Sequence, residues 1–131
     1  MPLPLVEARG YADRAIARAT ELGVRIGVAV VDELGQLVQL DRMDGAPLLA
    51  PDTALAKALT ALYFQQPTSS LAARFAQQPG QLERFQALAP FTLLPLPGGL
   101  PLQRAGEVIG AIGVSGATTE DDERIAQAAL G

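Results

Sequence analysis

Two pairs of short β-prone runs, each joined by a tight turn, constrain the fold of this chain more than any other feature. The first pair is 25–31 and 36–40, and the second is 100–104 and 107–115. Short connections pair strands in the antiparallel sense, whereas parallel strands need long crossovers. The sequence therefore predicts two β-hairpins in one antiparallel sheet, with the β-branched run 25–31 buried on both faces.

Helical periodicity occupies the segments around the hairpins. Apolar residues recur every three or four positions in 4–22, which Gly23 closes as a left-handed cap, and in the segment 47–64. The segment 67–87 predicts two short helices broken at a Pro-Gly pair, with Thr68 or Ser69 as N-cap. A capped helix over 118–130 ends the chain, and 91–94 forms a further short β-prone run. The order helix, two strands, helices, strands, helix indicates an α+β fold.

Composition excludes several classes of function. The 131 residues suit one domain, 1–131, and they include neither His nor Cys, which removes disulfides, thiolate sites and the usual metal and heme ligand. We therefore expect no metal site. A net charge of −4 with scattered Arg argues against nucleic-acid binding. Because no segment is long and apolar enough to span a bilayer and no signal peptide is evident, we expect a cytoplasmic protein.

Three patterns in two segments resemble functional motifs without meeting their requirements. The spacing of glycines in 110–116 is not that of a dinucleotide-binding loop, and it closes a hairpin instead of opening a helix. Ser115 lies in this segment without a His to deprotonate it, which argues against a serine hydrolase. The acidic run 120–123 lacks the alternating ligands of a calcium loop, so negative charge at a helix N-terminus explains it better.

Polar residues at the end of the first hairpin suggest a small anion-binding pocket. Arg42 and Asp44 follow the strand, Lys57 is the only lysine, and a flexible glycine pair follows later. The residues that we predict to bind a ligand are Arg42, Met43, Asp44, Lys57, Gly98, Gly99 and Ser115. The alternative is structural: Arg42 and Lys57 pair with Asp32, Asp41 or Asp44 and tie the hairpin to the next helix.

Two other functions remain open on this reasoning. A small enzyme of the isomerase, hydratase or lyase type could act on an organic acid, with Lys57 and Asp32 or Asp44 as the proton-transfer groups. A structural oligomer without a tight ligand is the third hypothesis. The apolar, proline-rich segments 47–51 and 91–101 favour a homo-oligomer, because one small domain does not readily cover them.

The chain resembles a known family along nearly its whole length. The strings that carry the resemblance are AVVDELGQLVQLDRMDGA at 29–46, AKALTA at 56–61, GGLP at 98–101 and GEVIGAIGVSGA at 106–117. They are similar to the GlcG/HbpS-type heme-binding family and to the C-terminal domain of PduO-type corrinoid adenosyltransferases. The resemblance implies a profilin-like subunit with a five-stranded antiparallel sheet, assembled into dimers to octamers. It also implies an accessory or sensory protein whose ligand is a tetrapyrrole such as heme.

The absence of His departs from the heme ligation that the resemblance implies for PduO-type domains. The axial ligands that remain are weaker donors: Met43, Tyr11, Tyr63, Thr60 and Lys57. Met43 lies within the string shared with the family, which also favours a packing role. A heme on an apolar oligomer interface would place its propionates on Arg42 or Lys57. The second ligand class, a small organic acid, needs only the cationic groups.

Overall fold

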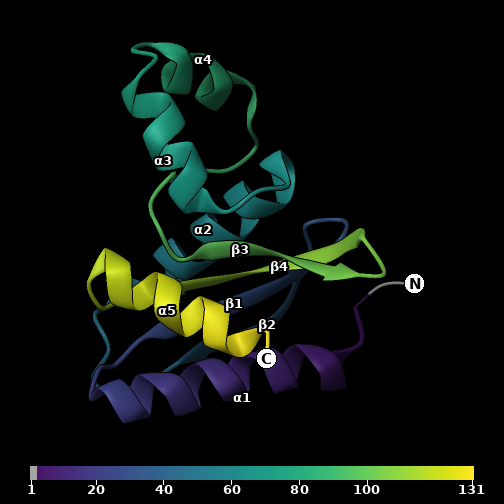
Figure 1. The fold of residues 1–131 in the computed structure, drawn as a ribbon, viewed down its shortest axis with the longest axis vertical. Helices are drawn as coiled ribbons and strands as arrows, with labels where there is room; N and C mark the ends of the chain where they lie inside the picture. The colour runs from purple at the N-terminus through teal and green to yellow at the C-terminus, as the bar shows by residue number, and fades with distance from the viewer. Residues whose placement is uncertain (1–2) are drawn as a thin grey trace.

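The computed structural model describes residues 3–131, and its elements follow the predicted order (Figure 1). In chain order they are α1 (Leu5–Leu22), β1 (Gly27–Asp32), β2 (Leu37–Arg42), α2 (Ala50–Phe64), α3 (Thr68–Ala76), α4 (Gln81–Leu88), β3 (Gly99–Arg104), β4 (Glu107–Ser115) and α5 (Thr119–Ala129). Helices α3 and α4 project from the sheet, away from α1 (Figure 1). The α+β prediction is confirmed.

The sheet has four strands within the described residues, not the five that the resemblance implied. Its order is β2-β1-β4-β3, and all three neighbouring pairs are antiparallel. Both predicted hairpins are present, and they join through the β1–β4 pair. The β-prone run 91–94 is an irregular loop because side chains take its backbone N–H groups. Leu93 N donates to Gln86 Oε1, and Leu94 N donates to Thr60 Oγ1.

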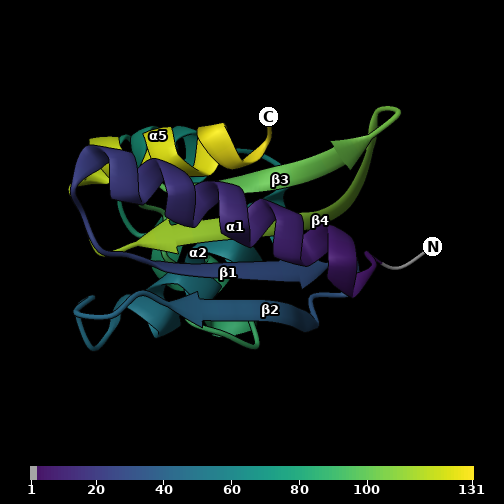
Figure 2. The ribbon, with the colours of Figure 1, turned by 90° about the horizontal axis from the view of Figure 1, so that it is seen from below.

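Helices cover both faces of the sheet. Figure 2 shows α1 in front of the strands and α2 behind them, with α5 beside α1. Val28 and Val30 of β1 belong to the core on the α1 and α5 side, whereas Ala29 and Val31 belong to the core under α2. All six residues of β1 are buried, which confirms the expectation of a strand covered on both faces.

Most of the predicted helix ends are confirmed, with one correction. Gly23 caps α1 with a left-handed φ of 72°, and the Thr118 side chain accepts a hydrogen bond from Asp121 N at 3.1 Å at the beginning of α5. Neither Thr68 nor Ser69 caps α3, because Pro67 occupies that position. The Thr68 hydroxyl instead accepts from Gly99 N at 2.9 Å and donates to the Leu96 carbonyl. It therefore fixes the loop before β3.

Candidate functional site

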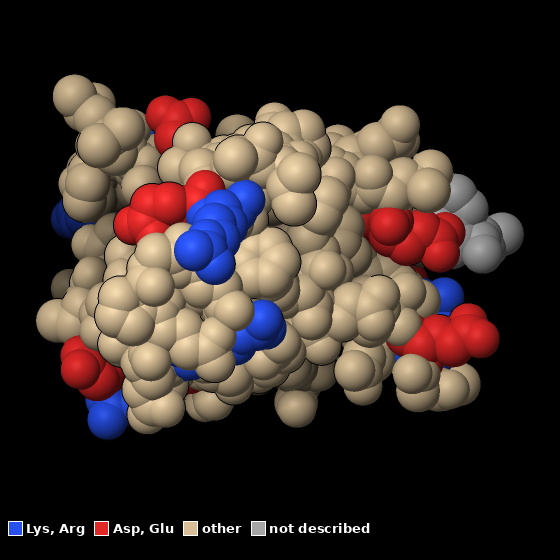
Figure 3. All heavy atoms as spheres, turned by 90° about the horizontal axis from the view of Figure 1, so that it is seen from above, with Lys and Arg blue, Asp and Glu red and all other residues tan. Residues whose placement is uncertain are grey.

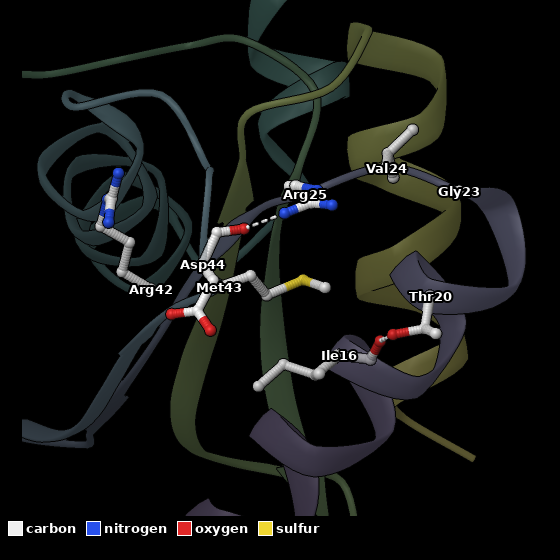
Figure 4. A pocket seen from close by; sticks show the side chains of 8 residues that line it. All are labelled: Ile16, Thr20, Gly23, Val24, Arg25, Arg42, Met43 and Asp44. Atoms are coloured by element: carbon white, nitrogen blue, oxygen red, sulfur yellow. Dashed lines mark hydrogen bonds between the residues drawn. The ribbon is translucent and has the colours of Figure 1, made fainter.

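A hollow of about 520 Å³ lies between the C-terminal half of α1 and the loop that follows β2 (Figure 4). Two stretches of chain form its walls. One runs from α1 through the Gly23 cap to Arg25, and the other lies at the end of β2. The lining residues are Ile16, Thr20, Gly23, Val24, Arg25, Arg42, Met43 and Asp44. Three of the residues predicted to bind a ligand are thus among them.

Met43 is the central side chain of this hollow. Its thioether extends toward α1 between Ile16 and the Asp44 backbone (Figure 4). The sulfur accepts a hydrogen bond from Ile26 N at 3.4 Å, which holds the side chain at the beginning of β1. Met43 also packs against the core on the α1 side. The predicted packing role is therefore confirmed, and the sulfur still faces the hollow.

The cation at the mouth of the hollow is Arg25, not the predicted Arg42. Arg25 Nη1 donates to the Asp44 carbonyl at 2.8 Å, and the guanidinium is exposed. Arg42 turns to the other side of the strand end, where its Nη2 donates to the Ala46 carbonyl at 2.6 Å (Figure 4). Sequence reasoning missed Arg25 because it counted this residue as part of the strand 25–31. Its position two residues after the helix cap is the signal that could have placed it.

Lys57 lies outside the hollow, in a buried ion pair. Its Nζ is 3.0 Å from Asp122 Oδ2 and donates to the Val114 carbonyl at 3.0 Å. The other carboxylate oxygen of Asp122 accepts from Ala117 N at 3.0 Å. Lys57 and Asp122 are each 2% exposed, so water does not screen their attraction. Lys57 therefore forms a structural ion pair, as the alternative proposed. Its partner is Asp122, not Asp32, Asp41 or Asp44.

Two opposing effects act on the ionisation of the Asp122 carboxyl. Burial raises the pKa of its carboxyl above the ordinary value, and the Lys57 ammonium and Ala117 N–H partly offset that rise. The pair is therefore costly to bury and costly to break. It ties α2 to α5 across the end of β4.

Gly98 and Gly99 enclose Lys57. A Cβ at Gly98 would lie 3.0 Å from Lys57 Nζ, and one at Gly99 would lie 2.4 Å from the Lys57 carbonyl. Ser115 is nearby at the end of β4, where its Oγ lies 2.7 Å from Thr53 Oγ1 of α2. The structure therefore separates the predicted residues into two groups: Met43, Asp44 and Arg42 near the hollow, and Lys57, Gly98, Gly99 and Ser115 at the α2–β4 contact.

Asp32 belongs to neither group. Its Oδ1 accepts from Leu34 N at 2.9 Å and from Gln36 N at 3.0 Å, which closes the β1–β2 turn. Asp32 is 5% exposed and Lys57 2% exposed. Two of the three residues considered for proton transfer are thus engaged in internal contacts, and Asp44 alone of them lines the hollow.

The remaining candidates for axial ligands differ in availability. The Thr60 hydroxyl is buried and bonded to the Ala56 carbonyl and Leu94 N. Tyr63 is 55% exposed and packs edge-on against Phe91, while the Tyr11 ring lies under the Arg14 guanidinium. Among these candidates, Met43 lines the hollow of about 520 Å³, whereas Tyr63 lines two smaller hollows of about 230 and 280 Å³.

In residues 3–131, no three His, Cys, Asp or Glu side chains lie close enough together to hold a metal ion. No helix of this range is long and apolar enough to cross a membrane.

Comparison with known proteins identifies the family. A model of the family described as "Haem degrading protein HbpS-like" matches residues 3–131. An uncharacterised 15.0 kDa protein of Citrobacter freundii, from the dhaT-dhaS intergenic region, is 37% identical over 129 residues, which are 98% of this chain and 89% of that protein. The chain belongs to the HbpS-like family, and the resemblance noted in the sequence is confirmed.

Two further relatives extend this assignment. The corrinoid adenosyltransferase PduO of Citrobacter freundii is 32% identical over 131 residues, covering 99% of this chain but 38% of that enzyme. The chain thus spans little more than a third of that relative. A crystal structure of a PduOC:heme complex superposes with a TM-score of 0.88 at 31% identity, covering 99% of this chain and 94% of the other.

Proposed function

We propose that this chain is an accessory protein that binds a tetrapyrrole of the heme type in the hollow beside Met43. The observation that carries the proposal is a ligand-sized hollow with a thioether inside it and a guanidinium at its mouth. A relative of the same fold in complex with heme supports the class of ligand.

The residues of the hollow fit such a ligand. Its volume lies within the roughly 300–1,000 Å³ typical of small-molecule sites. Ile16, Val24 and the Met43 methyl group supply apolar walls, and Arg25 supplies a charged partner for a carboxylate. Heme, when bound, supplies an iron that a methionine sulfur can ligate. Met43 is therefore the residue of the hollow whose sulfur would hold the iron in the absence of histidine.

A small organic acid is the second candidate. Arg25 favours it, because a guanidinium binds a carboxylate through two parallel hydrogen bonds. Proton-transfer chemistry receives less support, since Lys57 and Asp32 are engaged inside the protein. We also propose that the protein is a homo-oligomer, because Leu48 is 87% and Leu49 67% exposed in the segment 47–51.

A hemin titration followed by absorption tests this proposal. We expect saturable binding by the wild type, with a dissociation constant at least tenfold higher for Met43→Leu, which keeps the apolar volume but removes the sulfur donor. Arg25→Gln should weaken binding as well. Arg18→Gln is the matched control, because the Arg18 side chain is 39% exposed on α1, is paired with Glu21 and does not line the hollow.

The outcomes test the position of the binding site and the identity of the ligand separately. Saturable hemin binding that neither Met43→Leu nor Arg25→Gln changes would place the heme elsewhere. A titration of the wild type without saturation would overturn heme as the ligand. Organic acids that then bind and lose affinity in Arg25→Gln would support the second candidate.

A further inference from the structure

Two further hollows lie at the C-terminal end of α2, and both are lined by Tyr63. Among the described residues, neither shares a lining side chain with the hollow beside Met43. The first, of about 280 Å³, has Glu33 and Leu34 of the β1–β2 turn and Gln65 in its lining, and we call it the Glu33 hollow. The second, of about 230 Å³, is lined by apolar side chains of α2, α4 and the loop after α4, and we call it the aromatic hollow. The two hollows are therefore a separate place for a ligand.

The Glu33 hollow is negatively charged. Glu33 is the acid of its lining, and the described part of that lining contains no Lys or Arg. The four ion pairs found within residues 3–131 do not involve Glu33. The end of α2 adds to the negative potential, because a helix C-terminus carries a partial negative charge and the last turn of α2 holds no basic residue. This hollow therefore favours a cation.

The β1–β2 turn fixes the place of Glu33 before any ligand arrives. The Asp32 carboxylate accepts hydrogen bonds from two backbone N–H groups of the turn, at 2.9 and 3.0 Å. A Cβ at Gly35 would lie 3.8 Å from Tyr63 Cε1, so the turn is in contact with α2. A site whose backbone is already in place loses less free energy on binding than one that must first become ordered.

Tyr63 adds a second attraction for a cation. It is 55% exposed, and its ring packs edge-on against Phe91. A cation within about 6 Å of the centre of a tyrosine ring is attracted by the negative face of that ring. Leu34, which is 71% exposed, offers apolar surface in the same hollow. An ammonium group bonded to carbon suits this mixture better than a metal ion, which needs several oxygen ligands.

The aromatic hollow is suited to an uncharged group. Besides Tyr63, its lining residues are Phe64, Phe85, Leu88, Ala89, Pro90 and Leu93. Gln86 holds the loop after α4 in place, because its side chain donates to the Phe91 carbonyl at 2.8 Å and accepts from Leu93 N at 2.7 Å. An apolar cavity of about 150 Å³ holds benzene, so a hollow of about 230 Å³ has room for a phenyl group.

Arg74 sets the direction in which a ligand would lie. Figure 3 views the molecule from the α3–α4 end, where uncharged side chains form most of the surface and Lys and Arg are few. Arg74 Cζ lies 5.9 Å from the ring centre of Phe64 and 5.7 Å from that of Phe85. Because this guanidinium already lies over two rings of the aromatic hollow, it would repel a second cation there. An ammonium group therefore belongs in the Glu33 hollow, and a hydrocarbon group belongs in the aromatic hollow.

We propose that the end of α2 binds a small organic cation, an ammonium group attached to a hydrocarbon group of about the size of a phenyl ring. The ammonium group lies between Glu33 and the Tyr63 ring, and the hydrocarbon group lies against Phe64 and Phe85. Each hollow alone is smaller than the roughly 300–1,000 Å³ typical of small-molecule sites, whereas the two together reach that range. The site is independent of the proposed heme site, so each proposal is tested separately.

Titration of the protein with phenethylammonium, without hemin and followed by the NMR signals of the backbone amides, tests this site. We expect saturable shifts with a dissociation constant of about 1 mM. The shifts should be largest near Gln65 and Val108, which line the Glu33 hollow, and absent near Met43. Phenethyl alcohol has the same phenyl group without the charge and should bind about tenfold more weakly.

Two variants, each with a matched control, locate the two ends of the ligand. Glu33→Gln keeps the shape of the side chain without its charge and should raise the dissociation constant about fivefold. Its control is Asp13→Asn, because Asp13 is exposed on α1 and lines neither hollow. Ala89→Leu fills part of the aromatic hollow and should also raise the constant about fivefold. Its control is Ala87→Leu, because Ala87 is exposed on α4 and does not line that hollow. Circular dichroism confirms that each variant is folded.

Saturable binding that Glu33→Gln and Ala89→Leu weaken, and that neither control changes, supports the site. Equal affinity for phenethyl alcohol, or binding that Glu33→Gln leaves unchanged, would show that the protein does not recognise the positive charge here. Binding that Ala89→Leu leaves unchanged would remove the aromatic hollow from the site. A titration without saturation overturns the proposal as a whole.

Discussion

Replacement of Asp122 by Asn is expected to lower the free energy of unfolding by about 3–5 kcal/mol. The substitution keeps the shape of the side chain but leaves the Lys57 ammonium buried without a counter-charge. Lys57 Nζ would retain only the Val114 carbonyl and the new amide as polar partners. Urea unfolding followed by circular dichroism measures the change.

Two comparisons show whether the loss comes from the unpaired charge. The double variant Lys57→Met with Asp122→Leu removes both charges and should lose much less than Asp122→Asn alone, because no buried charge remains. Arg124→Gln removes the exposed pair with Asp121 and should change stability by less than about 1 kcal/mol. If Asp122→Asn is as mild as Arg124→Gln, the ion pair is not buried as described.

Gly113→Ala is expected to destabilise the protein by about 3 kcal/mol or more, because its methyl group has no space. A Cβ at this position would lie 1.9 Å from the Ala54 carbonyl oxygen and 2.7 Å from Ala58 N, both of which are backbone atoms of α2. The helix would have to move away from β4, the strand against which it packs most extensively. Thermal unfolding measures the effect.

Gly10→Ala is the matched control for this substitution. Gly10 lies within α1, where the nearest atom to an added Cβ is the flexible end of the Arg14 side chain at 3.2 Å. Alanine favours the helix over glycine, so we expect a gain of up to about 1 kcal/mol. A Gly113→Ala variant that is as stable as the wild type would show that α2 does not approach β4 this closely.

The fold was largely predictable from local patterns. The two hairpins follow from short turns between β-prone runs, and the helices follow from apolar periodicity. The run 91–94 was the exception, because its β-prone residues predict a strand. Its backbone N–H groups instead donate to the Thr60 and Gln86 side chains, which the local sequence does not reveal. The number of strands therefore depended on contacts that no local pattern contains.

The site was predictable only in part, because it depends on the direction in which side chains turn and on ion pairs between residues far apart in the sequence. Sequence placed Met43 and Asp44 correctly at the end of the first hairpin, but not the side to which Arg42 turns. The partner of Lys57 is Asp122, which is 65 residues away in the acidic run 120–123. Stabilisation of a helix N-terminus by negative charge already accounted for that run, so nothing in the sequence indicated a pairing with Lys57. Charge at a helix end and charge for a buried lysine look the same in the sequence.

We expect this chain to bind a tetrapyrrole without histidine, and native mass spectrometry of the protein mixed with hemin measures that binding directly. One spectrum gives the number of chains and the number of bound hemes. We expect an oligomer that carries heme in a fixed ratio to its chains, with clearly less heme bound to Met43→Leu at the same hemin concentration. Masses of the protein alone in the presence of excess hemin would contradict it.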